Sequence, residues 1–115
     1  MKNIIDKEEA LATFEDAANE HGEATEQGNY KLGNICYDKI ILAVTFLKEN
    51  NGIPLLLPFL RHDSIGVRIW AASYLLQVYE QESIETLELA AANQGANAFT
   101  AKITLEEWRE GTLQL

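Results

Sequence analysis

Apolar residues recur every three to four positions along the first quarter of the chain, which is the period of an amphipathic α-helix. Between Asp6 and Gln27 the apolar positions are Leu11, Phe14, Ala18 and Thr25, with Ala10, Ala17, His21 and Ala24 beside them. Asp6 lies three residues before Glu9, as in a helix N-terminal capping box. Gly28 and Asn29 are typical of a helix end. The pattern predicts a first helix over residues 6–27.

A second helical pattern runs from Tyr30 to Glu49 and is apolar on more than one side. Its main stripe is Leu32, Cys36, Ile40, Ala43 and Leu47, widened by Ile35, Ile41, Leu42, Val44 and Phe46. Such a helix is covered on several sides. The stretch Ile40–Phe46 also fits a strand, but the helical period continues on both sides and no partner strand is evident. Asn50, Asn51 and Gly52 predict a turn.

Proline shapes the next segment, Ile53–Arg61. Pro54 suits the first helical position, whereas Pro58 removes a backbone hydrogen bond from a helix interior, so we expect a short or kinked helix. A helix over 65–79 follows, with Asp63 or Ser64 as its cap. Its expected core residues are Val67, Ala71, Tyr74, Leu75 and Val78.

The last third of the chain predicts two more helices. Gln81–Ser83 interrupts the apolar pattern, and a helix is expected over 85–92. Asn93–Gly95 indicates a turn, and a final helix over 97–109 ends at Gly111. The apolar contacts of that helix are expected from Ala98, Ala101, Ile103, Leu105 and Trp108. We therefore predict an all-α fold: one domain, residues 1–115, with about six helices in three antiparallel hairpins.

One stretch resembles a known repeat. In HEAT repeats an apolar helix ends in a Leu-Leu-type pair, an Asp begins a turn, and Val-Arg, Ala-Ala and Leu follow in the second helix. The matching positions are Phe59-Leu60, Asp63, Val67-Arg68, Ala71-Ala72 and Leu75. Small alanines allow two helices to approach closely, and Arg68 can pair with a carboxylate or a carbonyl across the hairpin. One hairpin cannot bury both its apolar faces, so neighbours must stack on it.

From Ala10 to Gly111 the chain resembles the small bacterial HEAT-like proteins called DUF2019, a family without an established activity. The resemblance rests on Leu56–Ala72 and on the ending Leu105–Gly111. It implies a HEAT/armadillo-like right-handed superhelix. Small acidic HEAT-like proteins of this kind resemble immunity proteins encoded beside bacterial toxins.

Charge narrows the choice of partner. The 115 residues include nine basic and 18 acidic residues, a formal net charge of −9. A phosphate backbone is repelled by such a surface, so direct nucleic-acid binding is disfavoured. A basic protein is attracted by the same field. The alternative is that the acidity serves only solubility.

Candidate catalytic groups are few. His21 and His62 lack metal-ligand spacing with each other or with Cys36, the single cysteine, and structural roles are expected for all three. Nucleotide-binding, hydrolase and zinc-protease motifs are absent. We expect no enzymatic activity, cofactor or metal; an enzyme would need Cys36 or a histidine in a pocket with a perturbed pKa. Neither a signal peptide nor a membrane span is evident, which predicts a cytoplasmic protein.

Two surface patches are candidates for binding a protein. The first comprises carboxylates of the first helix: Glu15, Asp16, Glu20 and Glu23. The second comprises Trp70, Ser73 and Gln77, which share one side of the 65–79 helix; alternatively, Trp70 packs against a neighbouring hairpin. The favoured hypothesis is an immunity-type protein that occludes a basic toxin such as a nuclease, as a monomer or weak homodimer. The alternative is a scaffold, adaptor or self-associating HEAT-like protein.

Overall fold

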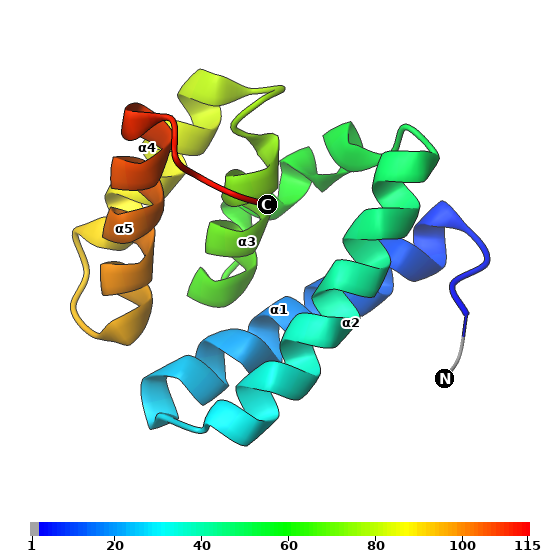
Figure 1. The fold of residues 1–115 in the computed structure, drawn as a ribbon, viewed down its shortest axis with the longest axis horizontal. Coiled ribbons are helices and arrows are strands. Elements are labelled where there is room, and N and C mark those ends of the chain that lie inside the picture. Colours follow the sequence, from blue (N-terminus) through cyan, green and yellow to red (C-terminus); the bar gives the residue numbers. More distant parts are fainter. Residues whose placement is uncertain (1–2) are drawn as a thin grey trace.

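The structure is a computed structural model that describes residues 3–115 (Figure 1). Its elements in chain order are α1 (Lys7–Gln27), α2 (Tyr30–Glu49), the 3-10 helix η1 (Ile53–Arg61), α3 (Ile65–Leu75), α4 (Glu80–Ala91) and α5 (Ala96–Glu110). Most of the described chain is helical, and no strand occurs in it. The predicted all-α class is confirmed, as is a helix rather than a strand at Ile40–Phe46.

Side-chain caps begin the first three α-helices. The Asp6 carboxylate accepts the Glu9 N–H at 2.7 Å, and the Asn29 side chain accepts the Leu32 N–H at 3.1 Å. Gly28 between these two helices has φ 67°, a left-handed conformation that glycine adopts without strain. Ser64, rather than Asp63, caps α3 by accepting the Val67 N–H at 3.3 Å. Of the two predicted caps, Asp63 and Ser64, the second is therefore the one that the structure shows.

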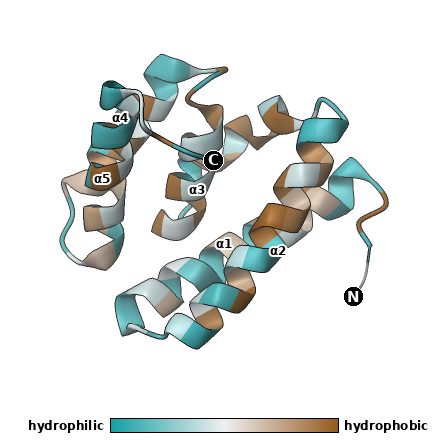
Figure 2. Cartoon of the chain, in the orientation of Figure 1, coloured by the Kyte–Doolittle hydropathy of each residue, from teal (hydrophilic) through white to brown (hydrophobic). Residues whose placement is uncertain are grey.

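Proline determines the geometry of η1. Pro54 lies in its first turn and Pro58 lies inside it, where the missing N–H prevents a regular α-helical ladder. The nine residues adopt a 3-10 helix, with Leu56 and Leu60 buried against the core. Figure 2 shows the apolar character of this segment and of the second half of α2 as brown ribbon.

The boundary between α3 and α4 was predicted wrongly. α3 ends at Leu75, four residues early, because the chain turns at residues 76–78 to bring α4 back against it. Val78 is consequently 49% exposed instead of buried. α4 begins at Glu80 and includes the predicted break at Gln81–Ser83. The carboxylates of Glu80 and Glu82 suit the positive end of the helix dipole and mark this start.

The predicted last helix is confirmed as α5, but one of its expected core residues differs. α5 extends one residue beyond the prediction at each end. Ile103 is 36% exposed, whereas Thr104 is buried in its place. The Thr104 hydroxyl can be buried there because it donates to the Thr100 carbonyl at 2.9 Å.

α3 lies at the centre of the molecule. Eight of its eleven residues are buried, because α1, η1, α4 and α5 all pack against it. Chain neighbours also pack in pairs, α1 with α2, η1 with α3, and α4 with α5 (Figure 1). α1 and α3 meet at Gly22 and Gly66, where either Cβ would lie 2.9 Å from the other Cα. The absence of side chains there permits backbone-to-backbone contact.

The last helix also touches the first. The Asn97 side chain donates to the Gly22 carbonyl at 2.9 Å, in a buried position. The Glu26 carboxylate accepts the Ala96 N–H at 2.7 Å. In a linear stack of repeats each unit contacts only its neighbours. In this fold α1 and α5 also contact each other, although they belong to hairpins that are not adjacent in the chain.

Candidate functional site

The carboxylates of the first candidate patch lie on one side of α1. At about 100° per residue, Glu15, Asp16, Glu20 and Glu23 fall within an arc of about 140°. The opposite side of the helix contains Ala10, Phe14, Ala17 and Ala18, which are at most 3% exposed. Burial of that side fixes the direction of the carboxylates.

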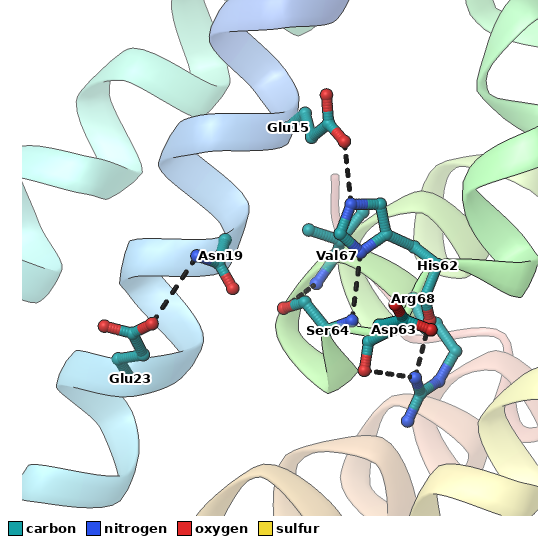
Figure 3. Close-up of polar contacts among 8 residues, drawn as sticks. All are labelled: Glu15, Asn19, Glu23, His62, Asp63, Ser64, Val67 and Arg68. Atoms are coloured by element: carbon teal, nitrogen blue, oxygen red, sulfur yellow. Dashed lines mark hydrogen bonds and ion pairs between the residues drawn. The ribbon is translucent and has the colours of Figure 1, made fainter.

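Glu15 lies at the edge of this face next to α3. Its Oε2 is 2.7 Å from His62 Nε2, in the connection between η1 and α3 (Figure 3). His62 Nδ1 accepts the Ser64 N–H at 2.9 Å. A ring nitrogen that accepts carries no proton, so Nε2 bears the hydrogen that is donated to Glu15. Glu15 is therefore held by the protein, and less available to a partner.

Glu20 lies at the opposite edge, next to α2. The Cys36 thiol contacts its Oε2, with a sulfur–oxygen distance of 3.7 Å. Burial, followed by the negative charge of Glu20, raises the pKa of the Cys36 thiol. Cys36 is fully buried. A buried cysteine with a raised pKa is a poor nucleophile, which supports a packing role for it.

Asp16 and Glu23 occupy the middle of the face and are exposed. Glu23 accepts a hydrogen bond from Asn19, one turn earlier, at 3.5 Å (Figure 3). Asp16 lines a shallow hollow with Glu15, Asn19, His62, Asp63 and Ser64. Neither carboxylate forms an ion pair with any of residues 3–115, in which Arg109 pairs with Glu88. Asp16 and Glu23 thus present charge to solvent without an ion-pair partner in that part of the chain.

The second candidate patch is split by the fold. Trp70 is partly buried and packs across the first hairpin: its ring centroid is 5.2 Å from His21 and 6.0 Å from Tyr37. Its Nε1–H donates to His21 Nδ1 at 3.4 Å. Ser73 is 6% exposed and donates to the Ile69 carbonyl, whereas Gln77 is exposed. The alternative reading of Trp70, packing against a neighbouring hairpin, is therefore what the structure shows.

A small cavity of about 190 Å³ lies beside Trp70. Its walls come from α1, α2, α3, α5 and the C-terminal segment, and they include His21, Tyr37, Tyr74, Asn97 and Leu115. Burial lowers the pKa of His21 and, with the nearby Tyr37, raises the pKa of Tyr74 to about 12. Both side chains are thus favoured in their neutral forms. The rings pack mainly on one another, which indicates a structural cluster.

A metal site within residues 3–115 would need several ligating side chains close together. Groups of three or more His, Cys, Asp or Glu side chains close enough to hold a metal do not occur in this part of the chain. Likewise, none of the described helices is long and apolar enough to cross a lipid bilayer.

The sequence does not predict two of the side-chain contacts made by α1. Glu26 is not among the predicted candidates, yet it caps the N-terminus of α5 across 70 positions of sequence. A structural role is predicted for His62 without a partner, and its contact with Glu15 on α1 supplies one. No local spacing signals either pair, because both depend on how α1 crosses the second half of the chain.

The chain was compared with known proteins at three levels. No protein-family model matches it, and neither a curated protein sequence nor a solved structure does.

Proposed function

We propose that this protein is a non-enzymatic binding module that recognises a basic protein through the carboxylate face of α1. The observation that carries the proposal is the exposure of Asp16 and Glu23 at the centre of that face without an ion-pair partner among the described residues. A net charge of −9 adds a long-range field that attracts a cationic partner and repels nucleic acid.

The specific role we propose is that of an immunity-type protein that occludes a basic toxin, such as a nuclease. Carboxylates at positions 16, 20 and 23 follow one another along α1 at intervals of about 4–6 Å. They would take the place of substrate phosphates in the toxin's basic cleft. The supporting fold is proposed to be HEAT-like, with η1 and α3 as one hairpin, and to depart from an open superhelix through the contact of α5 with α1.

Charge reversal tests this proposal. In the double variant Asp16→Lys/Glu23→Lys, affinity for the product of the adjacent gene should fall about 100-fold, since each lost charge pair contributes about 1.5 kcal/mol or more. The control is Glu82→Lys/Glu85→Lys, which reverses two charges on α4 and should weaken binding by less than about threefold. Co-expression followed by calorimetry measures both. The proposal fails if the adjacent gene encodes no toxin-like domain and reversal affects no partner that is found.

An adaptor or self-associating protein is the second candidate. Its support is apolar exposure on the last helix pair: Leu89 is 74%, Phe99 64% and Ile103 36% exposed. Light scattering over a range of concentrations tests self-association. A mass that rises with concentration in the wild type and not in Phe99→Glu supports it; a monomer at all concentrations contradicts it.

A further inference from the structure

We propose that the outer groove between α1 and α2 binds an amphipathic, lysine- or arginine-bearing helix of the partner. This inference rests on the proposed function and specifies the part of the partner that docks. The groove has a volume of about 450 Å³. It follows α1 from Glu9 to Glu20, a length of about 16 Å at 1.5 Å per residue. That length corresponds to about three helical turns.

The floor of the groove is apolar. Small side chains on α1, Thr13 and Ala17, leave space between the helices, and Ile35 and Leu42 of α2 complete this apolar part of the lining. Ile35 is 47% exposed, although it belongs to the apolar stripe of its helix. A partner that covers it gains hydrophobic free energy from area that is now in contact with water.

The rim of the groove is acidic. Asp16 and Glu20 project from α1 and Asp38 from α2, with Glu9 near one end and Lys39 as the basic group of the lining. Carboxylates on both walls above an apolar floor match a helix with apolar residues on one face and basic residues at its flanks. Asp16 also belongs to the α1 carboxylate face, so the groove and that face are continuous.

The backbone argues for a helix as occupant. In the middle of α1 and α2 the N–H and C=O groups are used within each helix, so the groove walls offer no free backbone edge to pair with a strand. A helix satisfies its own backbone and can lay side chains between the two ridges. A second copy of this chain is disfavoured, because a surface with net charge −9 would have to enter an acidic rim.

A synthetic peptide tests the groove on the full-length protein. The probe is a helix of about 14 residues with leucine on one face and lysine on the other, and the control peptide has the same residues in scrambled order. Amide chemical-shift changes should concentrate in residues 9–20 and 35–42 for the amphipathic peptide. Equal binding of the scrambled peptide, absence of binding, or changes spread over all acidic surfaces would overturn the proposal.

The decisive variant separates apolar docking from charge attraction. Ile35→Glu adds a negative charge while it removes the apolar wall, so it should weaken binding of the lysine peptide about tenfold. The matched control Leu55→Glu adds the same charge on η1, at an apolar side chain that is 46% exposed, and should alter affinity by less than about twofold. If Ile35→Glu strengthens binding or leaves it unchanged, only charge attraction operates. Asp38→Lys should also weaken binding about tenfold.

The same variants distinguish failure of the groove from failure of the proposed function. If Asp16→Lys/Glu23→Lys abolishes binding of the natural partner but Ile35→Glu leaves it unchanged, the carboxylate face binds the partner and the groove proposal is wrong. If Ile35→Glu and Asp38→Lys weaken binding of the natural partner while Leu55→Glu does not, the groove proposal is upheld. Circular dichroism establishes that each variant is folded.

Discussion

Gly22 of α1 and Gly66 of α3 face each other with no side chain between them. A Cβ at Gly66 would lie 2.5 Å from the Ala18 carbonyl oxygen and 2.9 Å from the Gly22 Cα. Both positions are buried, and both helices are held there by packing on their other sides. The two helices can therefore approach this closely only with glycine at the crossing.

Gly66→Ala should lower the free energy of unfolding by about 2 kcal/mol, because the backbone of α1 cannot move away from the new methyl group without losing its own contacts. The matched control is Gly33→Ala on α2, where a Cβ meets no described atom within 4 Å. That variant should be more stable by about 0.5–1 kcal/mol, since alanine favours a helix. Urea unfolding measures both, and equal effects of the two substitutions would contradict the close crossing.

Glu26→Ala should destabilise the fold by about 1 kcal/mol. Its carboxylate accepts the Ala96 N–H at the start of α5, and no side chain of α5 itself caps that end. Glu23→Ala, three residues earlier on the same helix, should change stability by less than about 0.5 kcal/mol, because Glu23 is exposed. Thermal unfolding in parallel compares them; indistinguishable midpoints would show that the cap contributes nothing.

His21 should make the stability depend on pH. Burial lowers its pKa in the folded protein, so the unfolded chain binds the proton more readily. The contribution of neutral His21 to the free energy of unfolding is present above the unfolded-state pKa of about 6.5. It is lost as pH falls through the folded-state pKa. Acidification below about pH 6.5 should thus destabilise the wild type more than His21→Gln, measured by urea unfolding with tryptophan fluorescence. Parallel pH profiles would exclude this role for His21.

Cys36 should react slowly with thiol reagents. It is fully buried, and both burial and Glu20 raise the pKa of its thiol. We expect modification of the native protein to be at least about 100-fold slower than in urea, because the thiolate is the reactive form. Rapid stoichiometric labelling of the folded protein at neutral pH would show instead that α1 and α2 separate readily.

The parts of the fold that the sequence predicts are those with local causes. Asp6, Gly28 and the apolar period define α1 and α2 to within one residue. The predicted end of α3 was wrong because Val78 continues the apolar stripe in the sequence. In the fold Val78 lies beyond the helix and is exposed. Within the candidate site, the shared direction of the α1 carboxylates can be predicted from the sequence, because the helical period alone determines it. The contacts of Glu15 and Glu26 depend on the crossing of α1 with α3 and α5, which no spacing encodes.

The link between α1 and α5 has a consequence for unfolding. Asn97 and Glu26 join the first helix to the last, so neither terminal helix is attached by its chain neighbours alone. An open array of hairpins can lose its end unit first and unravel stepwise. In this protein, release of α5 exposes part of α1, and loss of α1 removes a wall of α3. Unfolding should accordingly be a single cooperative transition in which amides of both terminal helices exchange together.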